Sequence, residues 1–215
     1  MPKPSSLSFA LGKILFATLV ITTFAMPSHA APEPEYQVVQ LLADFEVRQY
    51  VAYTVAETVV AGPADKAGSQ AFPILAGYIF GKNKGERKFE MTAPVTQAVV
   101  PTKLEMTAPD TQTNAPGGFL VQFVLPKGVT VANAPEPLDA RVQLREISAA
   151  QVAVIRYSGL WSRSNDDDHL AKLQAALRAA NLRCTGEAVY SRYNAPFTPW
   201  FLRRNEIWLH LAACN

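Results

Sequence analysis

The sequence lacks the short motifs that mark common catalytic and cofactor sites. It has no C-x-x-C pair, no H-E-x-x-H, no glycine-rich phosphate loop and no G-x-S-x-G. It has only three histidines, and His29 lies within the first thirty residues. Residues 31–215 therefore cannot supply a multi-histidine metal site. These absences argue against an enzyme and leave a binding protein as the expectation.

An excess of charge of one sign is also missing. The chain has 20 basic and 18 acidic residues, and Lys3 and Lys13 account for the difference because no acid occurs before residue 31. A nucleic-acid binder normally carries a basic patch or stripe. We therefore expect no nucleic-acid partner. With 49% hydrophobic and 18% charged residues, the composition is that of a folded globular protein.

The apolar run near the N-terminus is too short to be an ordinary membrane span. It covers residues 14–26, whereas a membrane-spanning helix needs roughly 20 apolar residues. A basic opening precedes it, and Ser28 and Ala30 place small residues at the positions that a signal peptidase reads. We interpret residues 1–30 as a secretory signal peptide, with a retained anchor as the alternative. The single domain of residues 31–215 is then expected to be periplasmic or secreted, without a stable membrane span.

Both cysteines lie near the C-terminus. Cys184 opens one strand-like run, Cys214 follows another, and Pro196 and Pro199 mark a loop between them. A hairpin centred near Pro199 would place the two cysteines opposite each other, within the reach of a disulfide. Because disulfides persist outside the cytosol, we expect a Cys184–Cys214 bond. Two free thiols are the alternative.

Hydrophobic periodicity predicts two helices among about ten strands. Pro73 lies inside the first helix and should kink it or mark its first turn, and Asn165 is the expected N-cap of the second. The predicted helices cover residues 64–80 and 165–181, and the strands cover 36–42, 45–50, 52–60, 87–100, 103–112, 119–125, 141–147, 151–157 and a final hairpin within 184–211.

The order of strands, helix and strands occurs twice, over about residues 36–125 and 140–212. We therefore predict an α+β fold, a distorted antiparallel β-barrel or curved sheet made from two related halves, each with one packed α-helix. A shorter repeat lies within the first half. KFEMTAPVTQ at residues 88–97 recurs as KLEMTAPDTQ at 103–112, with eight of ten residues identical. Its prolines favour the rim of a sheet or the wall of a pocket.

The doubled Met-Thr-Ala-Pro resembles the SOUL haem-binding protein family. The same resemblance holds, in order, for FEVRQY at 45–50, the helix segment from Ala71 to GKN at 81–83, YN at 193–194 and RRNEIW at 203–208. It covers about residues 36–211. The resemblance implies the two-halved barrel, and it implies non-covalent binding of haem or another tetrapyrrole in an apolar cleft, usually without a catalytic role.

Several residues are candidates for contact with that cofactor. Methionine is polarizable and packs well on aromatic surfaces, and arginine can meet a ligand carboxylate through two parallel bonds. For each candidate there is a plainer structural role, in the core or on the solvated surface. The candidates are Phe72, Leu75, Tyr78 and Ile79 on one helix face, Met91 and Met106 in the repeat, and Tyr193, Arg203 and Arg204 near the last strand.

No residue stands out as an iron ligand. The first-strand position at which a family histidine has been proposed as a ligand holds Gln49, and helix positions proposed to meet the propionates hold Ser69 and Gly77. His169, beside three aspartates, is expected to be a solvated surface residue. His210 is either a sheet histidine or a pocket group.

Two other functions stay open. The fold also resembles the effector domains of bacterial drug sensors, which suggests a binding module for flat hydrophobic or cationic small molecules. A small-molecule hydrolase could instead use Glu206 with Tyr50 or Tyr193 as acid–base groups. In the predicted hairpin register Glu206 opposes Arg192, so a cross-strand ion pair is its structural alternative.

Overall fold

The computed structural model describes residues 33–100 and 118–212. These residues form nine strands, two α-helices and one short 3₁₀ helix. In chain order they are β1 (Tyr36–Leu41), β2 (Glu46–Tyr50), β3 (Tyr53–Val60), α1 (Ala64–Ile79), β4 (Val95–Val99), β5 (Phe119–Val124), β6 (Gln143–Ile147), β7 (Ala150–Tyr157), α2 (Arg163–Ala179), β8 (Cys184–Arg192), the 3₁₀ helix (Trp200–Leu202) and β9 (Asn205–Leu211).

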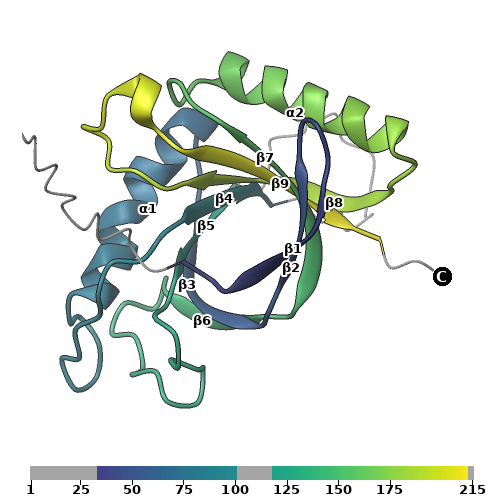
Figure 1. Cartoon of the computed structure of the whole chain (residues 1–215). Helices are drawn as coiled ribbons and strands as arrows, with labels where there is room; N and C mark the ends of the chain where they lie inside the picture. Colours follow the sequence, from purple (N-terminus) through teal and green to yellow (C-terminus); the bar gives the residue numbers. More distant parts are fainter. Residues whose placement is uncertain (1–32, 101–117, 213–215) are drawn as a thin grey trace, which may run out of the picture. The chain divides into compact units, whose positions relative to one another are not determined.

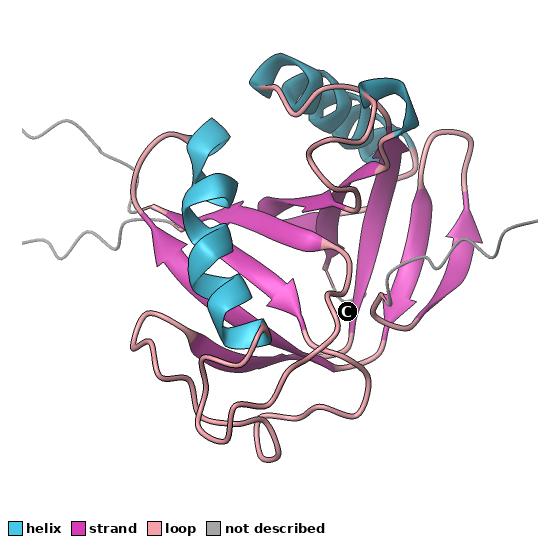
Figure 2. Cartoon of the chain, turned by 90° about the vertical axis from the view of Figure 1, so that its left-hand side faces the viewer, coloured by secondary structure: helices cyan, strands magenta, loops and turns pink. Residues whose placement is uncertain are grey.

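All nine strands belong to one antiparallel sheet in the order β1-β2-β7-β9-β8-β4-β5-β3-β6. The sheet curls into a half-barrel, and both helices lie outside the curl (Figure 1). Helix α1 packs against β3 and β5, and α2 packs against β7, β8 and β9. Figure 2 shows the two helices on separate parts of the sheet. The predicted fold class is confirmed.

The two halves have the same order of elements. The first half is β2-β3-α1-β4-β5, and the second is β6-β7-α2-β8-β9. They meet where β4 pairs with β8. Each half also places its first strand in the other half, because β2 pairs with β7 and β6 pairs with β3. Neither half therefore completes its own part of the sheet.

Helix α1 buries a face of small and large apolar residues against the sheet. Ala67 and Ala71 bring the helix backbone close to β3 and β5, and the larger Leu75 fills the next turn. The helix begins at Ala64, so Pro73 lies well inside it and does not mark its first turn. Pro73 is exposed, on the side away from the sheet.

Helix α2 begins earlier than the sequence predicts. Its N-cap is Ser162, whose Oγ accepts a hydrogen bond from the backbone N–H of Asn165 at 3.3 Å. The prediction that Asn165 is the cap is wrong, because its amide donates instead to the carbonyls of Ser158 and Leu160. An asparagine three residues into a helix offers the same sequence signal as one at the cap.

Strand β4 is shorter than predicted and covers only the end of residues 87–100. The backbone before it is tied to α1, since the N–H of Phe89 donates to the carbonyl of Ile79. Pro94, which cannot donate to a strand ladder, directly precedes β4. The strand predicted at 103–112 lies outside the described residues.

The final hairpin has a different register from the predicted one. A bulge between Thr185 and Val189 shifts the pairing, so Cys184 lies opposite Leu211. The predicted opposition of Cys184 and Cys214 is therefore wrong. Cys214 itself lies outside the described residues, and the disulfide stays a prediction. Within the part of the chain that the structure describes, no helix has the length and apolar character needed to cross a membrane.

Candidate functional site

The inner face of the half-barrel carries a polar and aromatic cluster next to α2's half of the sheet. Alternation along β9 creates it. Ile207 and Leu209 point toward α2 and join its hydrophobic core, whereas Trp208 packs on the opposite face of the sheet with Tyr50 and Val152. Glu206, two residues before Trp208, lies on that same inner face.

Glu206 is the centre of this cluster and is 0% exposed. Arg48 donates two hydrogen bonds to its carboxylate, at 2.9 and 3.1 Å. Arg204 Nε, Tyr193 Oη and Trp208 Nε1 donate one each, at 2.9, 2.8 and 2.9 Å. A buried charge is costly unless it is paired and hydrogen-bonded, and five donors meet that requirement here.

The surroundings of Glu206 keep it ionised. Burial alone would raise its pKa, but the hydrogen bonds and charge of Arg48, followed by the charge of Arg204, outweigh burial and hold the pKa below its ordinary value. Burial raises the pKa of Tyr50 and Tyr193 above that of a free phenol, and the charge of Glu206 adds to the effect for both. No group of this cluster is thus set to exchange a proton near neutral pH.

The ion pair predicted between Glu206 and Arg192 is not formed. Arg192 lies opposite Asn205 in the hairpin, one residue away from the predicted register. Its guanidinium donates hydrogen bonds to the carboxylate of Asp166 on α2. It donates another to the hydroxyl of Tyr157. Helix α2 is thereby tied to the sheet by a half-buried ion pair.

Arg48, the principal partner of Glu206, was not among the predicted site residues. Its side chain is buried on β2 and stacks over the ring of Tyr36 with 4.4 Å between the guanidinium carbon and the ring centroid. Its Nε also binds Glu46 at 2.7 Å. A sequence signal exists, because an arginine at an inward position of an otherwise buried strand needs an acidic partner.

Three of the four candidates on the first helix lie in the hydrophobic core. Leu75, Tyr78 and Ile79 are buried between α1 and the sheet. They therefore have the structural role in the core that was the alternative to contact with a cofactor. Phe72 differs, since it is 47% exposed and its ring meets that of Phe123 in an edge-type contact, with 5.6 Å between centroids. Phe72 is therefore the one member of this predicted set whose ring reaches the surface.

The remaining candidates also have defined surroundings. Met91 is half-buried and packs on the core of α1, and Met106 lies outside the described residues. Arg203 donates to two carbonyls of the β8–β9 loop. Arg204 forms two 3.0 Å bonds to Glu33 besides its bond to Glu206. Contact of these residues with a cofactor stays a prediction.

The β8–β9 loop exposes a run of large apolar side chains that the sequence prediction missed. Trp200 and Phe201 pack edge to face at 5.5 Å, and Phe197 is 89% exposed. The N–H of Gly159 donates to the carbonyl of Trp200, which brings the exposed Leu160 beside the loop. We call this set the loop surface, and it consists of Leu160, Phe197, Trp200, Phe201 and Leu202. Its signal in the sequence is PFTPWFL, too short and too broken by proline for a periodicity.

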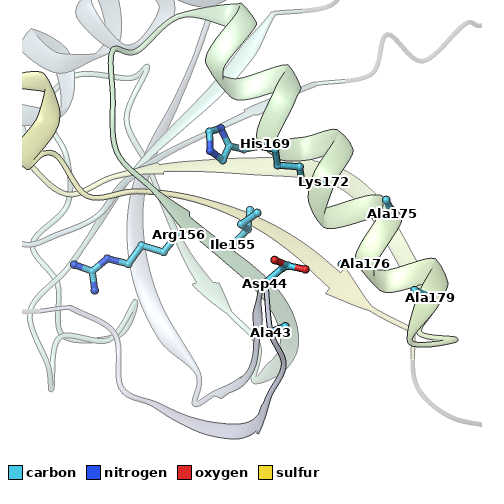
Figure 3. Close-up of a pocket in the computed structure, with 9 residues that line it drawn as sticks. All are labelled: Ala43, Asp44, Ile155, Arg156, His169, Lys172, Ala175, Ala176 and Ala179. Atoms are coloured by element: carbon cyan, nitrogen blue, oxygen red, sulfur yellow. The ribbon is translucent and has the colours of Figure 1, made fainter.

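A shallow groove of about 640 Å³ lies between α2, β7 and the turn that joins β1 to β2 (Figure 3). Alanines of α2 form much of its wall, with Asp44 facing them and His169 and Lys172 along the helix. The prediction that His169 is a solvated surface residue is wrong, because its side chain is half-buried. Its ring stacks on Tyr157 at 4.2 Å, and its Nδ1 lies 2.7 Å from the carbonyl oxygen of Asn165.

The other histidine of the described chain lies on the last strand. His210 is half-buried between Val152 of β7 and Thr185 of β8, and burial lowers its pKa. Across residues 33–100 and 118–212, no group of three or more histidine, cysteine or acidic side chains is placed to hold a metal ion.

Comparison with known families gives a match over most of the chain. The family model described as SOUL heme-binding protein matches residues 31–210. Heme-binding protein 2 of Homo sapiens is 29% identical over 186 residues, which cover 85% of this chain and 82% of that protein. Heme-binding protein 1 of Sus scrofa is 27% identical over 153 residues, covering 68% and 72%. Both relatives are named as binding proteins, in agreement with the expectation that the chain is not an enzyme.

Solved structures share the fold at much lower sequence identity. The crystal structure of the EcmrR C-terminal domain has a TM-score of 0.53 and 11% identity, over 82% of this chain and 98% of that one. The crystal structure of a hydrolase from Listeria innocua also has a TM-score of 0.53, with 12% identity over 81% and 94%. At these identities the likeness shows the half-barrel architecture alone.

Proposed function

Because the chain belongs to the SOUL heme-binding protein family, we propose that it is an exported protein that binds haem or another tetrapyrrole without a covalent bond and transports or buffers it. The observation that carries this proposal is the loop surface. Exposed apolar side chains gathered on two adjoining loops are uncommon on a monomer and typically mark a binding site. Three of the five are aromatic rings, which suit the flat face of a porphyrin.

The side chains of the loop surface fit the ring of a tetrapyrrole and supply no iron ligand. Phenylalanine, tryptophan and leucine have no lone pair to offer a metal. Affinity then comes from apolar contact, and one large apolar side chain contributes roughly 1.5–3 kcal/mol when fully buried. The exposed ring of Phe72 is a further candidate contact. Haem, when bound, would supply the iron and its redox chemistry, while the chain supplies the apolar surface.

The two alternative functions are less well supported by the inner face. The inner face offers a cationic ligand no free carboxylate at its centre, because Glu206 already holds Arg48 and Arg204. A hydrolase needs groups that exchange protons at the working pH. The pKa of Glu206 is held low and the pKa of Tyr193 is raised, so this pair does not meet that need.

The test is a pair of titrations, with hemin and with iron-free protoporphyrin, read by absorbance at the Soret band. We expect both to bind at micromolar concentration with similar affinity. Trp200→Ala and Phe72→Ala should each weaken binding roughly tenfold, because about 1.4 kcal/mol of lost contact is a factor of ten. Leu75→Ala is not a useful binding variant, since loss of a buried leucine lowers stability by roughly 2–5 kcal/mol.

His169→Ala is the matched control on another surface, the groove beside α2, and should leave both affinities unchanged. If neither porphyrin binds the wild type at micromolar concentration, the proposed function is wrong. If His169→Ala removes hemin binding and spares protoporphyrin, the ligand lies in the groove with an iron–histidine bond, and the loop surface is not its site.

A further inference from the structure

Both ends of the β8–β9 loop are attached to the same buried carboxylate. Tyr193 directly follows β8 and Arg204 directly precedes β9. Tyr193 Oη and Arg204 Nε donate to the two different oxygens of Glu206, at 2.8 and 2.9 Å. The Arg204 guanidinium also lies over the Tyr193 ring, with 3.7 Å to the centroid. The entry and exit of the loop are thus held together by one residue of the sheet.

Backbone contacts continue this attachment into the loop. The N–H of Tyr193 donates to the carbonyl of Arg204 at 3.3 Å. The N–H of Arg204 donates to Asn194 Oδ1 at 2.6 Å. Arg203 Nε and Nη2 donate to the carbonyls of Thr198 and Pro196, at 2.8 and 2.6 Å. These polar groups of the loop are therefore paired with one another, while its large apolar side chains are exposed.

A residue of the N-terminal segment also binds Arg204. Glu33 binds Arg204 through two parallel bonds of 3.0 Å. Arg204 is thus held between two carboxylates, one at the centre of the sheet and one in the segment that precedes β1. Both Glu33 and Arg204 are only partly exposed, so the ion pair is better shielded from solvent than an ordinary surface pair.

We propose that Glu206 is a positioning residue for the loop surface, acting through Tyr193 and Arg204, and that Glu33 completes this support. A loop that is already ordered loses less conformational entropy when it binds a ligand, so pre-ordering raises affinity without any new contact. The inference rests on the proposed function only in naming a tetrapyrrole as the ligand. The ordering of the loop is a property of the free protein.

The variants remove single parts of the support and leave the loop surface intact. Tyr193→Phe removes one hydroxyl and keeps the ring under Arg204. Glu33→Gln removes one charge near the surface. Glu206→Gln is less informative, because it leaves two guanidinium groups beside a neutral amide and threatens the fold itself. Glu136→Gln is the control, since it breaks the exposed ion pair with Lys84 far from this network in sequence.

The first measurement is amide hydrogen exchange in the free protein at residues 194–204. We expect faster exchange there in Tyr193→Phe and Glu33→Gln, with the strands unchanged, and no difference in the control. The second is the hemin titration, in which both variants should bind about threefold to tenfold more weakly than wild type, the equivalent of one lost hydrogen bond or ion pair. A role confined to global stability would change exchange in the strands as well.

The outcomes separate the two proposals. Unchanged exchange at 194–204 in both variants overturns the positioning role of Glu206, whatever hemin does. Faster exchange with unchanged hemin affinity shows that loop order does not govern binding, which overturns the link to the ligand and leaves the proposed function standing. If wild type binds no porphyrin, the proposed function fails, and the exchange data alone decide whether Glu206 and Glu33 order the loop.

Discussion

At the scale of single residues, Arg48 and Glu206 show how a buried charge is tolerated in this half-barrel. Glu206 is fully enclosed, and Arg48 is the partner that donates two bonds to it. Arg204, Tyr193 and Trp208 supply the other donors. Such a pair contributes little over an apolar replacement of both residues, but removal of Arg48 takes away the largest share of the compensation for the buried charge of Glu206.

We therefore expect Arg48→Met to lower the free energy of unfolding by about 3–5 kcal/mol. Urea denaturation followed by circular dichroism measures this. Lys84→Ala is the control, because its ion pair with Glu136 is exposed and such pairs contribute about 0–1 kcal/mol. Equal losses in the two variants would show that the buried network has no special weight in the stability of this fold.

The same network makes stability depend on pH. Glu206 has a lower pKa in the folded protein than in the unfolded chain, so its stabilising effect is complete above the ordinary glutamate pKa of about 4.3 and is lost as the pH falls toward the folded value. The urea midpoint of wild type should fall steadily below about pH 4.3. Arg48→Met, which lacks the main group that lowers this pKa, should show a smaller fall over the same range.

At the scale of elements, the exchange of β2 and β6 between the two halves organises the sheet. Each exchanged strand carries an arginine that binds a carboxylate of the half that receives it. Arg48 of β2 binds Glu206 of β9, and Arg145 of β6 binds Glu57 of β3 at 2.9 Å. Strand pairing and ion pairing thus join the two halves at corresponding places.

From this exchange we expect that neither half folds alone. Without β6, strand β3 would present an unpaired edge, and without β2 the same holds for β7. Residues 33–131 and 132–212 expressed separately should show little dispersion in their NMR spectra and should regain the spectrum of the intact protein when mixed. A half that folds by itself would show that its hydrophobic core, and not the exchange, is sufficient.

At the scale of the whole molecule, the excess of basic over acidic side chains is confined to the N-terminal residues. Residues 31–215 carry equal numbers of basic and acidic side chains, and the excess lies in residues 1–30. A basic opening before an apolar run is typical of a signal that is removed on export. Glu33, which binds Arg204 at the end of the β8–β9 loop, follows the expected cleavage site closely.

We expect the exported protein to begin at Ala31. Intact mass spectrometry of protein recovered from the periplasm or the medium should give the mass of residues 31–215. A mass that includes residues 1–30 would contradict the signal peptide and favour a retained anchor. The uncleaved chain of residues 1–215, produced in the cytosol, serves as the reference for the mass difference.

The sequence by itself determined the family, the fold class and most strands and helices of this protein. These depend on local patterns. The spacing of apolar residues indicates the buried face of a strand or helix, and short motifs in a fixed order indicate the family. The alternation in β9 already separated Glu206 and Trp208 from the apolar Ile207 and Leu209. Periodicity likewise placed Leu75 on an apolar face of α1.

The tertiary structure decided what covers each face and which residues meet. The pattern in α1 could not tell the buried Leu75 from the exposed Phe72, because exposure depends on the packing partner. The ion pair of Arg48 and Glu206 joins residues 158 positions apart, and no local rule links them. The bulge in β8 shifted the register of the hairpin. Counting residues outward from a predicted turn assumes regular pairing and cannot reveal such a bulge. Distance in the chain and irregular pairing are the physical reasons that these features needed the fold.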